Sequence, residues 1–530
     1  MMVLLPLLAC KPAPPVAVDT RIEGTIYLSA SEQTSAIAIA SGVVVSVGEE
    51  AMAADAAEVI SLGGGVAVPG FHDAHTHLLP GSFVLARLVT MGASSLDSLI
   101  RQVAEYAADT PDEPWIVGFG WVYSLMDSLE GLRLDEAISD RPVILVDSAG
   151  HSALVNSRAM ALAGITADTP DPEGGEIVRD PKTGEPTGLL LEDALSLVSD
   201  VAMSEYSDED FIEGLRAPLE QMTTAGLTSI SDIMASPGFD VSFPWIFQQL
   251  DEAGELPLRI HYHAPIFDLD MLDNAIALGT AYDTERVRMA GLKVWVDGST
   301  SSAEGWVSEP LHGTTDDYGS VYFTTDELME VVYAAEDAGL RLRLHVIGDA
   351  AVTASLDALE AVAAANGGLQ QQHTLEHVVL AQPSDLVRMA ELGVVASVQP
   401  THSIVAGLGS IPEAWGDERF EAAYDLRAFA DAGVPLAMGT DWPVWPTLDA
   451  VVSLWAAQNL GDRSLTVAEA LDAYTAGSGR AAGLAGELGC LSPGCLADIT
   501  VLSEDPLSVS GDALSEIDVE QVFVGGERVR

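Results

Sequence analysis

The stretch Pro69-Gly70-Phe71-His72-Asp73-Ala74-His75-Thr76-His77 follows a short apolar run at residues 65–68. We interpret this run as a β-strand that the motif closes. Residues two apart on an extended backbone face the same side, so the imidazoles of His75 and His77 can reach one metal ion. The junction between a buried strand and a loop is also where barrel enzymes hold their catalytic groups. A metal site would require further ligands from later strands.

Seven further apolar runs follow, and amphipathic helical stretches separate them. This alternation predicts parallel strands connected by helices. The runs are 226–232, 258–263, 291–297, 342–348, 373–378, 394–399 and 434–441. Together with 65–68 they make eight strands, so we predict an α/β fold with a distorted (β/α)8 TIM barrel over residues 69–485.

Both ends of the chain differ from this central pattern. Residues 21–68 and 486–530 contain short alternating apolar runs, and neither segment has enough strands for a core of its own. We therefore predict one small β-sandwich built from both termini. A stretch rich in Gly, Pro and Asp, about 114–200, interrupts the alternation after the first strand, and we expect an inserted subdomain that forms a substrate wall on the active-site face.

The charge of the chain limits its partners. It has 80 acidic and 23 basic residues, a formal net charge of −57. Such a surface repels nucleic acid and anionic lipid, so a small-molecule substrate is expected instead. Lysine occurs only at Lys11, Lys182 and Lys293, and Lys293 lies in a predicted strand. A buried lysine is costly unless it is paired or chemically altered, so Lys293 requires an explanation.

The N-terminus resembles an export signal. Residues 1–9 are apolar but too few to span a bilayer, and Leu7-Leu8-Ala9-Cys10 resembles a bacterial lipobox. This predicts a lipid anchor at Cys10, a tether up to residue 20 and location in the bacterial cell envelope. No Lys or Arg precedes the apolar stretch, so an ordinary cleaved signal or a frayed apolar start remains the alternative. Cys490 and Cys495 flank a turn, and their pairing as a disulfide would agree with export.

Further histidines and a carboxylate lie at the predicted strand ends. They are His345, His377 and Asp441, with Lys293 on the fourth predicted strand. Imidazole and carboxylate ligands suit zinc or a similar ion with a position open for water. A histidine on a strand is more often a hydrogen-bonded core residue, but that interpretation would have to hold independently at several strand ends.

Several segments resemble the metal-dependent amidohydrolase superfamily, in particular the branch that includes N-substituted formamide deformylases. The first is Pro69 to His77. The others are Gly150-His151-Ser152-Ala153-Leu154-Val155-Asn156-Ser157, Lys293-Val294-Trp295-Val296-Asp297-Gly298-Ser299, His345-Val346-Ile347-Gly348-Asp349-Ala350, Leu375-Glu376-His377, Ser397-Val398-Gln399-Pro400-Thr401-His402 and Gly439-Thr440-Asp441-Trp442-Pro443-Val444. These segments occur in the order expected for that branch.

The resemblance implies a site with two divalent metal ions, for which zinc is expected. In that pattern His75 and His77 bind the first ion, His345 and His377 bind the second, and a carbamylated Lys293 bridges them. Asp441 contacts the first ion, takes a proton from the bridging water and delivers it to the leaving nitrogen after hydroxide attack. An alternative for Lys293 is an ion pair with Asp297 on the same face of the strand.

Four residues are weaker candidates. His151 and His402 could line the substrate pocket, and His373 and Glu376 could support the ligands from behind. The leading hypothesis is a hydrolase of a non-peptide amide, such as an N-formyl or N-acyl amine. The alternatives are an N-acyl amino acid or cyclic amide hydrolase, which would need a basic pocket residue, and a non-catalytic surface-anchored binding lipoprotein. The candidate basic residues are Arg179, Arg341, Arg343 and Arg427.

Overall fold

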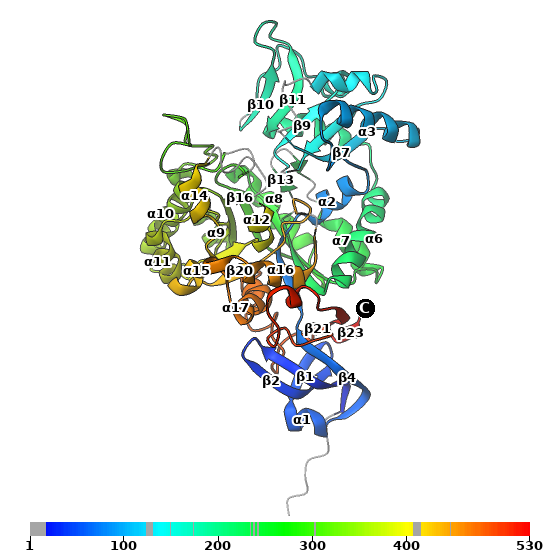
Figure 1. Ribbon diagram of the computed structural model, residues 1–530, viewed down its shortest axis with the longest axis vertical. Coiled ribbons are helices and arrows are strands. Elements are labelled where there is room, and N and C mark those ends of the chain that lie inside the picture. The colour runs from blue at the N-terminus through cyan, green and yellow to red at the C-terminus, as the bar shows by residue number, and fades with distance from the viewer. Residues whose placement is uncertain are drawn as a thin grey trace, which may run out of the picture.

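The computed structural model describes residues 17–122, 131–148, 150–172, 174–233, 235–236, 239–240, 243–300, 304–405, 415–445 and 447–530. The predicted lipobox and Cys10 lie outside these ranges. A barrel forms the middle of the molecule, with a separate β-sheet at each end (Figure 1). Within the described ranges, no helix has both the length and the apolar character needed to cross a membrane.

The barrel consists of eight parallel strands in chain order. They are β5 (Phe71–Thr76), β12 (Leu227–Ile233), β15 (Arg259–Pro265), β16 (Val287–Trp295), β17 (Leu342–Val346), β18 (Thr374–His377), β19 (Val395–Val398) and β20 (Leu436–Met438). The first and last strands approach each other at their carboxyl ends, where the backbone N–H of His77 donates to Trp442 O at 2.7 Å and that of Asp441 donates to His75 O at 2.7 Å. The predicted barrel fold is therefore confirmed.

The first barrel strand is not the one that the sequence suggested. Residues 65–68 belong to β4 (Asp55–Pro69), which pairs with β1 (Ala17–Ser29) and β21 (Ile499–Leu502) in the terminal sheet. The barrel begins instead with the motif itself, since β5 runs from Phe71 to Thr76 and all six of its residues are buried. The apolar run packs in the terminal sheet, whereas the polar residues of the motif fit the barrel because its interior is itself polar.

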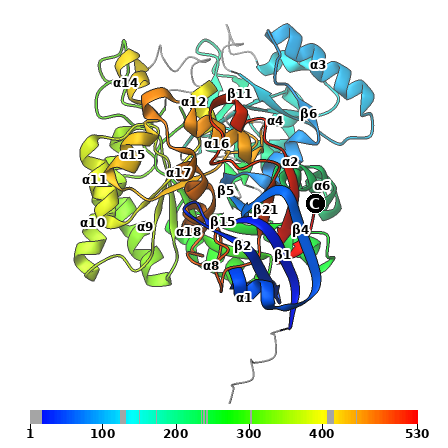
Figure 2. The same ribbon diagram turned by 60° about the horizontal axis from the view of Figure 1, so that its bottom comes forward.

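Strands from both termini form one seven-stranded sheet. Its order is β23-β22-β21-β4-β1-β2-β3, where the further strands are β2 (Glu32–Ala40), β3 (Val43–Val47), β22 (Val519–Val524) and β23 (Glu527–Arg528). The sheet packs around an apolar cluster that includes Ile22, Ile37 and Phe523, and an isolated bridge joins Val43 of the edge strand β3 to Leu496, just before β21. Strands from the two termini lie side by side in it (Figure 2). Cys490 and Cys495 form a disulfide beside it.

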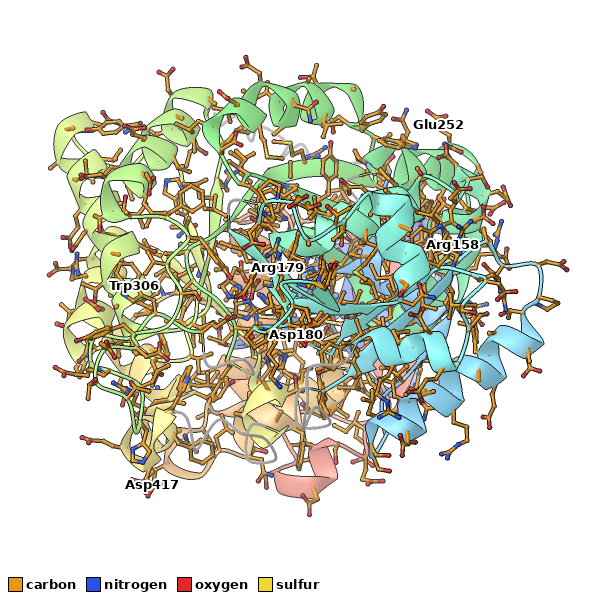
Figure 3. The ribbon with its side chains drawn as sticks, turned by 90° about the horizontal axis from the view of Figure 1, so that it is seen from above. Arg158, Arg179, Asp180, Glu252, Trp306 and Asp417 are labelled. Carbon is orange, nitrogen blue, oxygen red and sulfur yellow. A yellow bond between two sulfur atoms is a disulfide. The ribbon has the colours of Figure 1, made fainter. Side chains whose placement is uncertain are left out.

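The segment between β5 and β12 contains a six-stranded sheet. Its strands are β6 (Leu88–Val89), β7 (Ile116–Trp121), β8 (Val143–Asp147), β9 (Ser152–Val155), β10 (Gly175–Arg179) and β11 (Pro186–Glu192). It starts before the expected residue 114 and has a separate apolar cluster with α3 (Leu96–Asp109). Seen from above, Arg179 and Asp180 at the β10–β11 turn project over the middle of the molecule (Figure 3). This sheet lies at the end of the barrel opposite the terminal sheet (Figure 1).

Helices cover the outside of the barrel (Figure 1). They include α6 (Asp208–Thr224), α7 (Pro244–Glu252), α8 (Leu272–Ala281), α9 (Thr325–Ala338), α10 (Asp349–Asn366), α11 (Pro383–Leu392), α15 (Leu426–Ala432) and α16 (Ala450–Gln458). The sequence sets the ends of α9 clearly, because Thr324 and Glu327 form a capping box and Gly339 ends the helix with a φ of 70°. These helices fix the strands whose carboxyl ends carry the candidate ligands.

Candidate metal centre

Three of the predicted ligands meet at the closing seam of the barrel. The ligand atoms of His75, His77 and Asp441 lie within 4.8 Å of one another, and all three residues are buried. Nε2 of His77 is 3.1 Å from Asp441 Oδ1, and Nε2 of His75 is 3.5 Å from the same oxygen. Among the described residues, Nε2 of His75 and Oδ1 of Asp441 have no hydrogen-bond partner. Buried polar atoms are costly when unpaired, so this arrangement fits a cation.

The remaining predicted ligands surround this group. The ring of His377 is 4.7 Å from that of His75 and 4.5 Å from that of His345, measured between centroids. Lys293 is 1% exposed, and its charge acts on the imidazoles of all three. The structure therefore brings together the six residues that the sequence selected.

Hydrogen bonds orient the histidines of this cluster. Nδ1 of His75 donates to Glu376 Oε2 at 2.5 Å, that of His77 donates to the carbonyl oxygen of Ile233 at 2.9 Å, and that of His377 donates to Gln399 Oε1 at 2.9 Å. With the proton on Nδ1, each imidazole keeps a lone pair on Nε2, as a metal ligand requires. The sequence had indicated Glu376 but not the other two acceptors.

The electrostatics of the cluster also suit metal binding. Burial lowers the pKa of His75, His345 and His377, and the charge of Lys293 lowers it further. Neutral imidazole is the form that binds a metal. Burial acts to raise the pKa of Asp441, but His75 and His77 outweigh it and hold this pKa well below its usual range. Burial lowers the pKa of Lys293 to about 8, against the opposing charges of Glu376 and Asp441.

Two of the candidate ligands have an unusual backbone. His377 has a φ of 70° and Asp441 a φ of 60°. Residues other than glycine rarely adopt this backbone conformation. It costs about 1–3 kcal/mol, and such strained residues occur mainly at functional sites. His377 is the last residue of β18, and Asp441 lies three residues beyond the end of β20, so both strained positions are at the carboxyl end of the barrel.

The weaker candidates have different outcomes. His402 lies beside the cluster, with Nε2 3.7 Å from Asp441 Oδ2, and His151 reaches it from the inserted segment, with its ring 6.3 Å from that of His345. Nδ1 of His151 donates to Glu192 Oε2 at 2.8 Å. His373 is placed elsewhere: it precedes β18, accepts the Leu342 N–H and contacts Glu336. It cannot support the ligands, because they lie at the opposite end of the strands.

The alternative ion pair between Lys293 and Asp297 does not form. The Asp297 carboxylate accepts hydrogen bonds from the backbone N–H groups of Ile347, Gly348 and Trp306. Arg343, considered above as a group for a carboxylated substrate, is buried, and its Nη1 lies 2.7 Å from Glu376 Oε1. It holds the carboxylate that orients His75.

The barrel interior below the cluster is polar. His72 hydrogen-bonds with the hydroxyls of Ser229 at 2.8 Å and Ser231 at 3.0 Å. His261 and His263 are also buried, and none of their ring nitrogens has a hydrogen-bond partner among the described residues. These side chains replace the branched apolar layers usual in such barrels.

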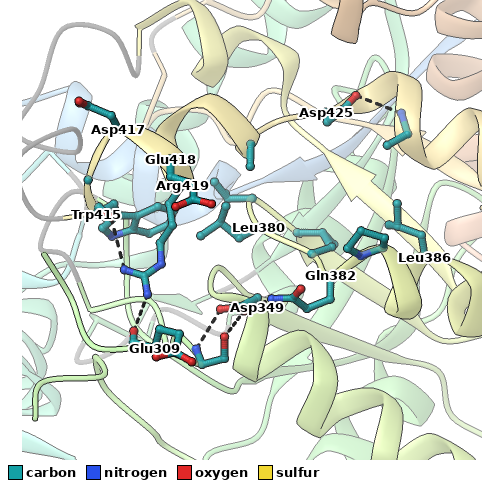
Figure 4. Close-up of a pocket in the computed structure, with 18 of the residues that line it drawn as sticks. Glu309, Asp349, Leu380, Gln382, Leu386, Trp415, Asp417, Glu418, Arg419 and Asp425 are labelled. Carbon is teal, nitrogen blue, oxygen red and sulfur yellow. Dashed lines mark hydrogen bonds between the residues drawn. The ribbon is translucent and has the colours of Figure 1, made fainter.

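Two cavities adjoin the rim of the barrel, and neither is lined by the six clustered residues. One, of about 650 Å³, lies next to the segment that follows His377 and is lined by Leu380, Trp415 and Arg419, among others (Figure 4). The other, of about 870 Å³, reaches Trp295 at the end of β16.

Comparison with known families identifies relatives over almost the whole chain. The model of the amidohydrolase family matches residues 58–530. Among curated proteins, N-substituted formamide deformylase of Arthrobacter pascens is 28% identical, over 93% of this chain and 94% of its own. Protein LONG AFTER FAR-RED 3 of Arabidopsis thaliana is 31% identical, over 96% and 90%.

Solved structures agree with this relationship. An uncharacterized metal-dependent hydrolase from Pyrococcus horikoshii superimposes with a TM-score of 0.75 at 25% identity, over 93% of this chain and 98% of its own. Another from Pyrococcus furiosus gives a TM-score of 0.72 at 27% identity, over 92% and 99%.

Proposed function

This chain belongs to the amidohydrolase family, and on that premise we propose that it is a metal-dependent hydrolase of N-formyl or N-acyl amines. Its family and relatives already make it an enzyme for carbon–nitrogen bonds other than peptide bonds. The observation that carries the proposal is the pair of unpartnered buried atoms, His75 Nε2 and Asp441 Oδ1, in a three-residue ligand group. The narrower substrate class is suggested by the formamide deformylase of Arthrobacter pascens.

We propose that two zinc ions occupy this site. His75, His77 and Asp441 would hold the first, and His345 and His377 the second. Lys293, as a carbamate, would lie between them. The buried ammonium group of Lys293 among histidines is unfavourable. Reaction of the neutral Lys293 amine with carbon dioxide would give a carboxylate-like anion and release one proton. When bound, the ions lower the pKa of water and polarise the carbonyl oxygen of the substrate.

Residues of the chain would carry out the proton transfer and hold the ligands in place. Asp441 accepts a proton from the attacking water and transfers it to the nitrogen as the carbon–nitrogen bond breaks. Its strained backbone turn fixes the carboxylate beside His75 and His77. Glu376 and Gln399 hold the rings of His75 and His377, so the ligand geometry does not need to reorganise during the reaction.

An N-acyl amino acid substrate has less support. The arginines that could bind its carboxylate are engaged elsewhere: Arg343 contacts Glu376, Arg179 contacts Asp171 and Arg427 contacts Glu469. No such contact is known for Arg341, but it lies at the amino end of β17, opposite the candidate site. Neutral or basic amides are therefore favoured.

The test is metal content followed by turnover of N-formyl and N-acyl amines. We expect about two equivalents of zinc and hydrolysis of at least one amide. A His75→Ala/His77→Ala variant should lose the first zinc ion and the hydrolytic activity. A His312→Ala variant, which removes a histidine that lines the smaller cavity and is not among the clustered residues, serves as the control. Protein that contains zinc but hydrolyses no member of the panel would contradict the proposed substrate class, and protein without bound metal would contradict the metal mechanism.

We also propose that the protein is exported to the bacterial cell envelope and anchored through Cys10. Support comes from the lipobox-like sequence and from the disulfide between Cys490 and Cys495, since disulfides persist in oxidising compartments. The mass of the native N-terminal peptide tests this: a lipid-modified Cys10 is expected, and an unprocessed Met1 would refute it.

A further inference from the structure

The larger rim cavity, of about 870 Å³, lies between the inserted segment and the barrel. Asp193 and Ser196 line it from the inserted segment, Phe267 from the loop after β15, and Trp295 from the end of β16. The ring of Trp295 also lies 5.1 Å from Nζ of Lys293. The side chain of Trp295 thus borders both the cavity and the candidate metal centre. A substrate whose amide lies at the metal centre could therefore place its other end in the cavity.

Several aromatic side chains line this cavity. The rings of Phe267 and Trp295 are stacked, with centroids 5.2 Å apart and planes 11° apart. Tyr322 and Phe323 also line the cavity. Aromatic faces bind flat apolar groups and attract cations, because their π-systems are negative on the face.

Acidic side chains also line the cavity. Among the described residues, five carboxylates and no Lys, Arg or His line it; the carboxylates belong to Asp193, Asp268, Asp270, Glu327 and Glu330. In a chain with 80 acidic residues, exposed carboxylates alone would be unremarkable. Asp193 differs because burial, with the charge of Glu192, raises its pKa to about 6. Its carboxylate is ionised at neutral pH but poorly hydrated, so a cation would stabilise it.

The smaller cavity lacks this combination. Its Asp349 carboxylate accepts the backbone N–H of Ser308 at 3.0 Å and also contacts Gln382, and its Asp425 caps a helix through the Ala428 N–H (Figure 4). Arg419 lies in the same lining and brings a positive charge. Among the described residues, the smaller cavity therefore has a cationic side chain beside its carboxylates, which the larger cavity does not have.

We propose that the larger cavity binds a positively charged group on the amine portion of the substrate, so that the enzyme prefers N-acyl derivatives of amines with a second, cationic nitrogen on an apolar or aromatic spacer. The spacer lies on Phe267 and Trp295, and the cation lies near Asp193 and Glu330. The identity of the ligand as a substrate rests on the proposed amide hydrolysis. Binding of a cation in the cavity can be tested without turnover.

The first test measures binding by calorimetry on the purified protein. The probes are 4-methylbenzylammonium, the neutral 4-methylbenzyl alcohol and the anionic 4-methylbenzoate. We expect the ammonium to bind about tenfold or more tightly than the other two, and less tightly as salt is added. An Asp193→Asn/Glu330→Gln variant should lose this preference, whereas the matched pair Asp417→Asn/Glu418→Gln at the other cavity should keep it. Equal binding of ammonium and benzoate, or equal loss in both variants, would overturn the proposal.

The second test measures kcat and KM for three formamides on the zinc-loaded enzyme. They derive from 4-methylbenzylamine, 4-(aminomethyl)benzylamine and 4-(aminomethyl)benzoate, so that only the charge at the far end of the ring changes. We expect kcat/KM to be about tenfold higher for the cationic than for the neutral formamide, mainly through KM. The preference should disappear in Asp193→Asn/Glu330→Gln.

The two tests separate the two proposals. Selective ammonium binding without hydrolysis of any formamide would support the cation site and contradict the proposed amide substrate. Hydrolysis without any preference for the cationic formamide would support the amide substrate and overturn the cation site.

Discussion

Nδ1 of His75 donates a 2.5 Å hydrogen bond to Glu376, which lies five barrel strands later in the chain. The second oxygen of that carboxylate accepts from Arg343 at 2.7 Å, and all three side chains are almost fully buried. The carboxylate is therefore fixed between an imidazole that it orients and a guanidinium that balances its charge. Carboxylate-to-histidine contacts behind a metal ligand fix the ring and raise its basicity.

Replacing Glu376 should weaken metal binding without removing a ligand. For Glu376→Gln we expect metal affinity to fall by about 10–100-fold, because the amide no longer supplies a negative charge to His75. Competition with a chelator measures this, and the exposed Glu418→Gln provides the control. Unchanged affinity in Glu376→Gln would show that the contact serves folding alone.

Lysine 293 offers a test with an internal control, because the chain has so few lysines. Lys293→Ala should lose about half of its bound metal and nearly all activity, and exposed Lys182→Ala should lose neither. With ¹³C-bicarbonate, a carbamate signal should appear in the NMR spectrum of the wild type and Lys182→Ala but be absent from Lys293→Ala. Near-wild-type turnover of Lys293→Ala would refute the bridging role.

A buried ion pair connects the barrel to the terminal sheet. Nε of Arg259 lies 2.8 Å from Asp498 Oδ2, and the side chains are 3% and 2% exposed. Arg259→Met should cost about 3–5 kcal/mol in the free energy of unfolding, because it leaves a buried carboxylate unpaired, and adding Asp498→Asn should recover part of the loss. The exposed pair Arg216–Glu255 is the control, since solvent screens it and Arg216→Met should cost much less than Arg259→Met. Denaturant unfolding measures all three, and equal costs would contradict the role of burial.

The pair His151 and Glu192 predicts how stability depends on pH. Burial acts to lower the pKa of His151, but the charge of Glu192 and its hydrogen bond outweigh it and raise this pKa. A histidine whose pKa is raised on folding stabilises the protein fully below its unfolded pKa of about 6.5, and this contribution is lost as pH rises through the folded pKa. His151→Gln should remove that decline in unfolding free energy, compared with the wild type in the same metal state. If the unfolding free energy of His151→Gln still declined at alkaline pH as in the wild type, the decline would belong to other titrating groups.

The acidic surface predicts a response to salt. At a net charge of −57, repulsion opposes the compact state, and added salt screens it. The thermal midpoint should therefore rise between low salt and about 1 M sodium chloride, where the screening length is about 3 Å. Potassium chloride should act equally, since the effect depends on ionic strength, and a midpoint that falls in both salts would contradict this expectation.

The sequence predicted the barrel well because seven of its strands are apolar runs between amphipathic helices. It failed at the first strand because periodicity favours the apolar residues 65–68, whereas β5 presents histidines to a polar interior. The six clustered residues could be predicted because each lies at a strand end or on a strand. His373 was misplaced for the related reason that it precedes its strand, and the contacts of Gln399 and Glu192 depend on neighbours that only the folded chain brings together.

The seam between β5 and β20 has a consequence for the order of folding. The backbone N–H of Asp441 donates to the carbonyl oxygen of His75 there, although almost the entire barrel separates them in the chain. Contacts between such distant residues form late, because the intervening chain must first be ordered. During synthesis the histidine pair emerges long before its carboxylate, so a nascent or truncated chain has an open barrel. Such a chain can hold only part of the candidate site, so we expect no hydrolysis until the last strand closes against the first.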